Sequence, residues 1–234
     1  MTDDLKTITP KTATRAEIDA YLARTKGLTP TVKPGQRGRL IFALDASASR
    51  QETWDAACQL QADMFREAAA IGGLDVQLVY YRGPGECRAS KWLSRPEDLT
   101  RLMERIKCVM GHTQIGKVLA HAEREAPVQA LVFVGDAMEE KLDDLCHTAG
   151  ELRRLGVPAF MFQEGDDPDA EQAFREIARV TRGAYCRFDP GAAHELAELL
   201  RAAAAYAAGG MSALTDLSAR HQGGAIKLLE QLKS

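Results

Sequence analysis

The chain lacks the features that mark several large classes of protein. No apolar run approaches the roughly 20 residues of a membrane-spanning helix. The opening stretch MTDDLKTITPKTATRAEID has acids where a secretory signal needs basic and then apolar residues. No basic block is interleaved with aromatic residues, and the formal net charge is −3. These absences predict a cytoplasmic protein that has no membrane and no nucleic acid among its partners.

The cysteines are few and scattered. The five are Cys58, Cys87, Cys108, Cys146 and Cys186, with no C-x-x-C pair among them. An odd number at wide spacing predicts neither a disulfide framework nor a zinc site. We expect reduced thiols, with Cys58 and Cys146 on the apolar faces of helices.

Short, continuous apolar runs are what the sequence does have. They are LIFAL (40–44), VQLVYY (76–81), ALVFV (130–134) and AFMF (159–162), with amphipathic stretches between most of them. Continuous runs, in place of alternating ones, are typical of strands that helices cover on both faces. The pattern predicts an α/β fold: a doubly wound, Rossmann-like, three-layer α/β/α sandwich with a mostly parallel central sheet.

One segment breaks the alternation of strands and helices. RGPGECRASKWLS (82–94) places a Gly-Pro-Gly turn before a run that follows too closely for a helical crossover. A hairpin explains that run best, so we expect one antiparallel edge strand.

Composition divides the chain into three parts. Residues 1–38 read as an N-terminal arm and linker, with a short helix over RAEIDAYLAR (15–24) and then a Pro- and Gly-rich stretch. Residues 39–208 form the sheet domain. Residues 209–234 form a C-terminal helical tail, which we expect to fold back onto the domain or to meet a partner.

The strand LIFAL runs directly into DASAS, which places Asp45, Ser47 and Ser49 at its carboxyl end. Two interpretations compete. These residues are common helix N-caps, which need no ligand. They are also three oxygen donors at the edge where open α/β sheets bind ligands.

Two later segments add oxygen donors in a similar context. Thr113 lies in GHTQIG (111–116), in a loop that opens a helix, and ALVFV ends at Gly135 and Asp136. Asp45, Ser47, Ser49, Thr113 and Asp136 together offer two carboxylates and three hydroxyls, without His or Cys. Such a hard, oxygen-only set suits Mg²⁺ or Mn²⁺ and fits zinc or copper poorly.

Asp-x-Ser-x-Ser, a Gly-flanked Thr and a strand-terminal Asp, in this order, resemble the metal-ion-dependent adhesion site (MIDAS) of von Willebrand factor type A (VWA) domains. The resemblance covers roughly residues 38–208. It implies a VWA-like fold and a protein-binding module in which Mg²⁺ engages an Asp or Glu carboxylate of a partner. It also implies that Asp45, Ser47 and Ser49 form the first ligand set, that Thr113 engages as the partner binds, and that Asp136 is the outer carboxylate.

The same resemblance points to an intracellular protein of bacterial type, working beside an ATPase or chaperone assembly. The sequence departs from the family pattern at two places. Gly135 stands where the family often has Thr, and His112 stands where Gly is frequent. His112 reads as a surface loop residue or as a pH-sensitive ligand contact. Glu139 and Glu140 read as ordinary acids of a helix's first turn, not as ligands.

Two other functions remain as alternatives. One is a Mg²⁺-dependent phosphatase-like hydrolase with Asp45 as nucleophile, although Ser47 stands where such enzymes typically place a second Asp. The other is a metal-independent scaffold. A serine hydrolase is disfavoured, since neither serine lies in G-x-S-x-G. We expect no catalytic residues and a protein that is not an enzyme.

Overall fold

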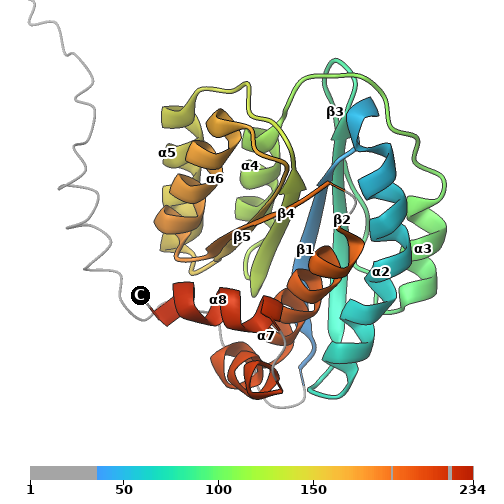
Figure 1. Ribbon diagram of the computed structural model, residues 1–234, viewed down its shortest axis with the longest axis vertical. Helices are drawn as coiled ribbons and strands as arrows, with labels where there is room; N and C mark the ends of the chain where they lie inside the picture. Colours follow the sequence, from blue (N-terminus) through green and yellow to red (C-terminus); the bar gives the residue numbers. More distant parts are fainter. Residues whose placement is uncertain (1–35, 191, 221–222, 234) are drawn as a thin grey trace, which may run out of the picture.

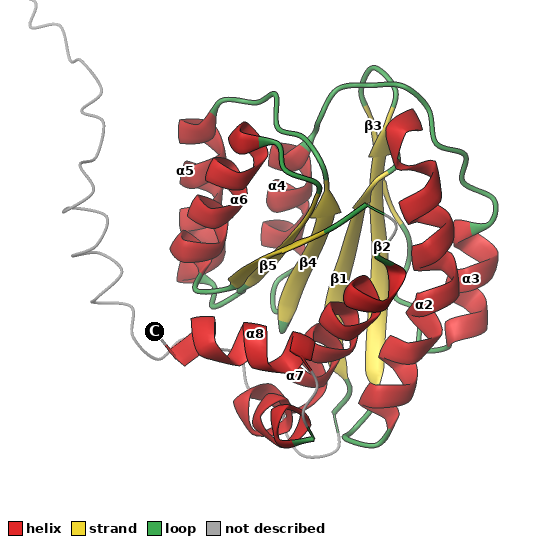
Figure 2. Cartoon of the chain, viewed as in Figure 1, coloured by secondary structure: helices red, strands yellow, loops and turns green. Residues whose placement is uncertain are grey.

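The computed structural model describes residues 36–190, 192–220 and 223–233 (Figures 1 and 2). The helix predicted over residues 15–24 lies outside them, as does nearly all of the predicted arm and linker. The strands are β1 (Gly38–Asp45), β2 (Leu74–Arg82), β3 (Glu86–Ala89), β4 (Ala130–Gly135), β5 (Ala159–Glu164) and β6 (Ala184–Phe188). The helices are η1 (Ala48–Arg50), α2 (Gln51–Ala69), α3 (Pro96–Met103), α4 (Ile115–Glu125), α5 (Leu142–Arg154), α6 (Pro168–Thr181), α7 (Ala193–Ala219) and α8 (Gly223–Lys233).

The strands form one sheet in the order β3-β2-β1-β4-β5-β6. Four of the strand pairings are parallel, and the pairing of β2 with β3 is antiparallel. The predicted fold class is confirmed, including its antiparallel edge strand.

Helices cover both faces of the sheet (Figure 1). On β1, Leu40, Phe42 and Leu44 belong to the core shared with α2, α3, α7 and α8. Ile41 and Ala43 belong to the core shared with α4, α5 and α6. Because both faces are buried, the strand carries an unbroken apolar run.

The chain changes direction across the sheet between β1 and β4, which are neighbours. From β1 the chain builds outward through β2 to β3, and from β4 it builds outward the other way through β5 to β6. The loops after β1 and β4 therefore leave toward opposite sides, which is where doubly wound sheets bind ligands. Asp45 ends β1, and Asp136 directly follows β4.

The C-terminal segment packs against the sheet domain. Leu214 and Leu217 of α7 and Leu228 of α8 are fully buried in the core on the α2 side. Gly210 interrupts α7 with a φ of 66°, a conformation that favours glycine. The division of the chain at residues 208 and 209 stays a prediction.

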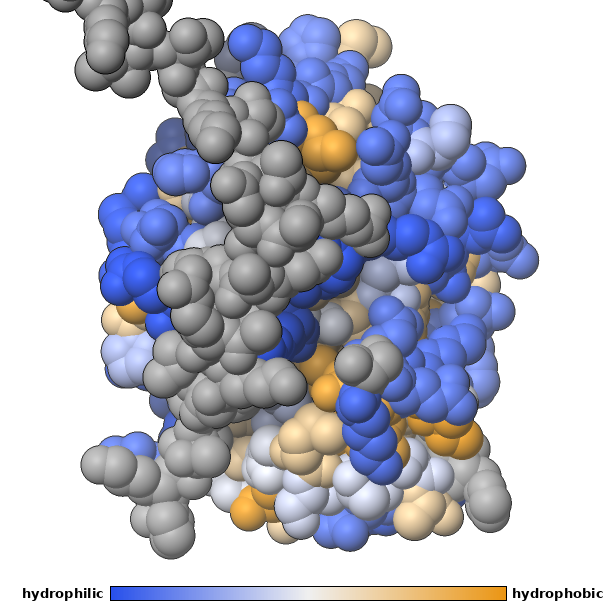
Figure 3. All heavy atoms as spheres, turned by 90° about the vertical axis from the view of Figure 1, so that its left-hand side faces the viewer, coloured by the Kyte–Doolittle hydropathy of each residue, from blue (hydrophilic) through white to orange (hydrophobic). Residues whose placement is uncertain are grey.

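The surface of the α7–α8 end is more apolar than the rest of the face in Figure 3, where the visible upper part is largely hydrophilic. Met211 and Ile226 are the large apolar residues of α7 and α8 with exposed side chains. Within the described residues, no helix combines the length and the apolar character needed to cross a bilayer.

Two residues of α8 test how firmly this helix is docked. Leu228→Ala should lower the free energy of unfolding by about 3 kcal/mol, because it removes a buried side chain and leaves a cavity. Ile226→Ala is the matched control: Ile226 is 37% exposed on the same helix and should cost less than about 1 kcal/mol. Urea unfolding measures both variants, and equal losses would show that α8 does not pack as described.

Candidate metal centre

The end of β1 turns sharply around Asp45. The residue is only 4% exposed, and its Oδ1 accepts a hydrogen bond of 2.7 Å from the backbone N–H of Ser47. A carboxylate that bonds the backbone two residues ahead forms an Asx turn. This turn leads the chain into η1 and then α2.

The structure does not support the helix-cap interpretation of DASAS. Ser47 and Arg50 occupy the N-cap positions of η1 and α2, and neither side chain makes a capping hydrogen bond. The two serine hydroxyls are therefore not engaged in capping these helices.

The serine hydroxyls instead connect the ends of two strands. Ser47 Oγ lies 3.1 Å from Ser49 Oγ, and Ser49 Oγ donates to Asp136 Oδ2 at 3.2 Å. Together with the turn at Asp45, these contacts bring four of the five predicted ligands into one group. The group connects the ends of β1 and β4, between which the strand order reverses.

Thr113, the fifth predicted ligand, joins this group indirectly. Its backbone N–H donates to Glu139 Oε2, and its Oγ1 accepts from the backbone N–H of Glu139, both at 3.0 Å. Glu139 lies three residues after Asp136. Thr113 is thus fixed to the loop that carries Asp136, and its hydroxyl bonds that loop rather than the other four side chains.

The neighbouring His112 is an exposed residue of the same loop. Its Nδ1 lies 3.0 Å from Glu139 Oε2. The pKa of Glu139 is lowered, first by the backbone N–H of Thr113 and then by His112. His112 therefore contacts the acid that holds Thr113.

The first-turn interpretation of Glu139 and Glu140 is wrong, because α5 begins only at Leu142. Glu140 instead accepts from Ile115 N and, at 3.0 Å, from Gly116 N at the start of α4. Since Gln114 provides no side-chain cap there, the carboxylate satisfies free N–H groups and meets the positive end of the helix dipole. The missing cap residue before Ile115 was the only sequence signal for this role.

Sequence reasoning also missed Arg50, the residue directly after DASAS. It is 3% exposed and forms an ion pair with Glu164, the last residue of β5. Glu164 also accepts from Thr53 Oγ1, and Arg50 Nε lies 3.9 Å from Asp136 Oδ1. AFMFQE did show a third strand that ends on an acid, but nothing local identified its partner.

Burial and charge raise the pKa of Asp45 to about 6. Removal from water is the main cause, and the nearby charge of Asp136 adds to it, while the Ser47 N–H and Arg50 act in the opposite direction. Burial also lowers the pKa of Arg50 and raises that of Tyr81, whose hydroxyl has no hydrogen-bond partner among the described residues. A cation beside Asp45 and Asp136 would relieve this surplus of negative charge.

The residues present fit a hard divalent cation. Two carboxylates with serine and threonine hydroxyls form the donor set that Mg²⁺ or Mn²⁺ prefers. Within residues 36–190, 192–220 and 223–233, no three His, Cys, Asp or Glu side chains gather as a metal-binding group. A zinc centre of the usual His and Cys type is therefore not found in this part of the chain.

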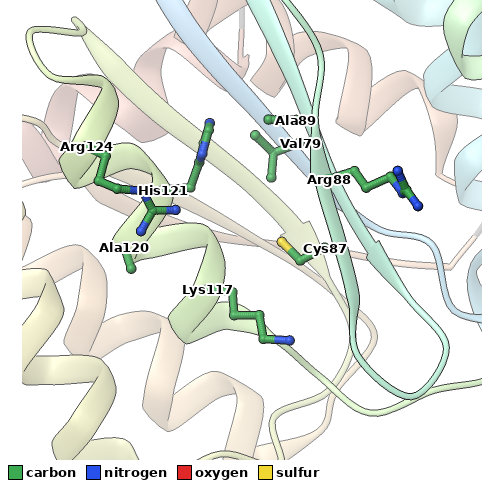
Figure 4. A pocket seen from close by; sticks show the side chains of 8 residues that line it. All are labelled: Val79, Cys87, Arg88, Ala89, Lys117, Ala120, His121 and Arg124. Carbon is green, nitrogen blue, oxygen red and sulfur yellow. The ribbon is translucent and has the colours of Figure 1, made fainter.

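A separate hollow of about 200 Å³ lies between β3 and α4, and none of the five predicted ligands lines it (Figure 4). Cys87, Lys117 and His121 are among its lining residues. Burial raises the pKa of the Cys87 thiol. Lys117 Nζ donates hydrogen bonds to Gly85 O and Gln114 Oε1. His121 Nε2 lies 2.8 Å from Gln77 Oε1. The hollow thus offers no activated nucleophile.

Comparison with known proteins shows the fold. No family model matches the sequence, and no curated protein does. Among solved structures, the SpRpn10 VWA domain matches with a TM-score of 0.56 at 13% identity, over 70% of this chain and 95% of that one. The vWF domain of the type V pili tip protein Mfa5 from Porphyromonas gingivalis matches with 0.54 at 10% identity, over 72% and 95%. The chain therefore has the fold of a VWA domain.

A third likeness is to proximal thread matrix protein 1 from the mussel byssus, in a structure described as having a zinc-occupied MIDAS motif. The TM-score is 0.58 at 15% identity, over 73% of this chain and 46% of that one. At this level of identity the likeness concerns the fold. What the site binds has to be argued from the residues described above.

The raised pKa of Asp45 gives a prediction for the protein in EDTA. The unfolded residue titrates near pH 3.9 and the folded one near 6, so the folded state binds more protons between these values. The resulting stability is fully present below about pH 4 and is lost as the pH rises through 6. The free energy of unfolding of Asp45→Asn, which imitates the protonated form, should therefore be higher than that of wild type by on the order of 3 kcal/mol at pH 7.5.

Near pH 4 the free energy of unfolding of Asp45→Asn should match that of wild type. Urea unfolding at the two pH values measures the difference between the proteins. A gap of equal size at both would show that Asp45 does not titrate as described.

Proposed function

We propose that this chain is a metal-dependent protein-binding module. Asp45, Ser47, Ser49, Thr113 and Asp136 would hold Mg²⁺ or Mn²⁺, and the ion would accept an Asp or Glu carboxylate from a partner protein. The observation that carries the proposal is the Ser47–Ser49–Asp136 series of contacts. It gathers two hydroxyls and one carboxylate beside Asp45, and the serine hydroxyls are not engaged in helix capping.

Each residue has a distinct part in this proposal. Asp45, with a pKa near 6, supplies negative charge at neutral pH, and Ser47 and Ser49 supply neutral oxygens from the same turn. Asp136 supplies the second charge from the loop after β4. A bound Mg²⁺ supplies positive charge and an exchangeable coordination position, which favours a carboxylate ligand.

Thr113 is the residue best placed to respond to a partner. Its hydroxyl accepts one hydrogen bond, from the Glu139 N–H, and keeps a further lone pair for another contact. It also lies two residues before α4. A change at Thr113 would therefore reach the start of that helix.

Two of the structures with this fold support the proposed function: one has a zinc-occupied MIDAS motif, and another is the vWF domain of a pili tip protein. We assign the binding function to residues 39–208 and regard residues 209–234 as a C-terminal helical tail. From the family resemblance, we also propose that the protein is cytoplasmic and that its partner belongs to an ATPase or chaperone assembly.

No specific observation favours an enzyme. Ser47 Oγ contacts Ser49, and no His contacts either serine among the described residues. A second Asp two residues after Asp45 is missing from the sequence. We propose a binding module that is not an enzyme, and the metal-independent scaffold is the outcome if the ion does not bind.

Metal binding is tested first. Asp45→Ala should abolish Mn²⁺ binding in calorimetry, because it removes the central carboxylate of the donor set. Asp143→Ala, which removes an exposed carboxylate of α5, is the matched control and should bind as wild type does. Mn²⁺ binding that is equal in Asp45→Ala and wild type would rule the site out. Phosphatase turnover that disappears in Asp45→Asn would favour the hydrolase instead.

The response of Thr113 is tested with a partner. A pull-down from native extract, with Mg²⁺ or with EDTA, identifies proteins that are retained only with the ion. Thr113→Ala should then lower affinity for that partner more than it lowers Mn²⁺ affinity, because the hydroxyl is needed mainly in the partner-bound state. Thr113→Ser keeps the hydroxyl and should stay close to wild type. Unchanged partner binding by Thr113→Ala would show that this residue only holds its loop.

A further inference from the structure

Arg50 is an unexplained charge beside the proposed metal centre. Its side chain is 3% exposed, and its Nε has no hydrogen-bond partner among the described residues. A buried polar group without a partner calls for a physical reason. The sequence offers none, since an arginine at the start of a helix is usually solvated.

The arginine lies among acids from three strand ends. Asp45 ends β1, Asp136 follows β4 and Glu164 ends β5, and these three strands are consecutive in the sheet. Arg50 ends η1, the next element after β1, and its guanidinium pairs with Glu164 at the end of β5. The side chain thus passes the end of β4, where its Nε lies 3.9 Å from Asp136 Oδ1.

Glu164 fixes the far end of the guanidinium. Its carboxylate accepts from both Arg50 and Thr53, and its side chain is only 8% exposed. A buried ion pair of this kind keeps its place when further hydrogen bonds satisfy its oxygens. Because one side of the Arg50 guanidinium pairs with Glu164, Arg50 does not form a close ion pair with Asp136.

We propose that Arg50, anchored on Glu164, is a positioning residue that holds the Asp136 carboxylate at the metal centre before any ion binds. The role of Asp136 as a ligand rests on the proposed function. In the metal-free protein Asp45 and Asp136 repel each other, and the hydrogen bond that Asp136 accepts from Ser49 comes from an uncharged donor and is long at 3.2 Å. Arg50 supplies the attraction that keeps Asp136 in place, while Glu164 leaves the carboxylate available to a cation.

The test removes both members of the buried pair together. Arg50→Met/Glu164→Gln removes both members of the buried Arg50–Glu164 ion pair at once and keeps an acceptor for Thr53, so we expect it to fold. Its net charge equals that of wild type. Removing the positive charge of Arg50 would by itself raise the affinity for a cation, so a loss of Mn²⁺ affinity reports the position of Asp136. We expect a loss of about tenfold, as for other partners that orient metal ligands.

A second readout needs no metal. In EDTA, Asp136→Asn should raise the melting temperature by about 2 °C more in the double variant than in wild type, because only wild type loses the attraction to Arg50. Arg50→Lys keeps the charge without the planar fork, and it should lose Mn²⁺ affinity as the double variant does.

The outcomes separate this inference from the proposed function. Equal effects of Asp136→Asn in the two backgrounds would overturn the inference, and so would wild-type Mn²⁺ affinity in the double variant. If wild type binds no Mn²⁺ but the two backgrounds still differ in EDTA, the metal-binding function fails and the positioning of Asp136 by Arg50 is supported.

Discussion

Repulsion between carboxylates at neighbouring strand ends is the constraint on which this edge of the sheet depends. Asp45 and Asp136 lie at the ends of β1 and β4, which run side by side, and burial strengthens any uncompensated charge there. The surrounding residues reduce that cost by ordinary means. Ser47 gives a backbone N–H to Asp45, Ser49 gives a hydroxyl to Asp136, and Arg50 brings a positive charge. These three groups neutralise only part of the negative charge of the two carboxylates. The remaining negative potential would attract a hard cation.

Much of the fold was predictable because it depends on local patterns. The stretch IGKVLAHAERE (115–125) coincides with α4, and the short segment after Gly-Pro-Gly forms the antiparallel edge strand β3. Apolar periodicity and turn chemistry determine such elements within a dozen residues. The order of the strands, β3-β2-β1-β4-β5-β6, was not among the predictions, although connections through helices in a parallel sheet leave few topologies.

The candidate site was predictable only in part. The sequence order of Asp45, Ser49 and Asp136 placed them at strand ends, and the structure brings them into one group. The contacts of Arg50 with Glu164, 114 residues apart, could not be read from any window of sequence. The sequence-based interpretation of Glu139 and Glu140 as first-turn helix acids fails because their hydrogen-bond partners are also distant in sequence. Their partners lie in the segment from Thr113 to the start of α4, about 25 residues earlier, and only the tertiary fold brings the two segments together.

The pair Glu139 and Glu140 also limits how this domain can be re-engineered. Two consecutive side chains bind Thr113, Ile115 and Gly116, so the segments 111–116 and 136–140 form one interlocked unit. A graft that exchanged only the first segment for the loop of another VWA-fold protein would leave two carboxylates facing a backbone of a different shape. These two segments are therefore a single module for transplantation, and a library that varies one of them has to vary the other with it.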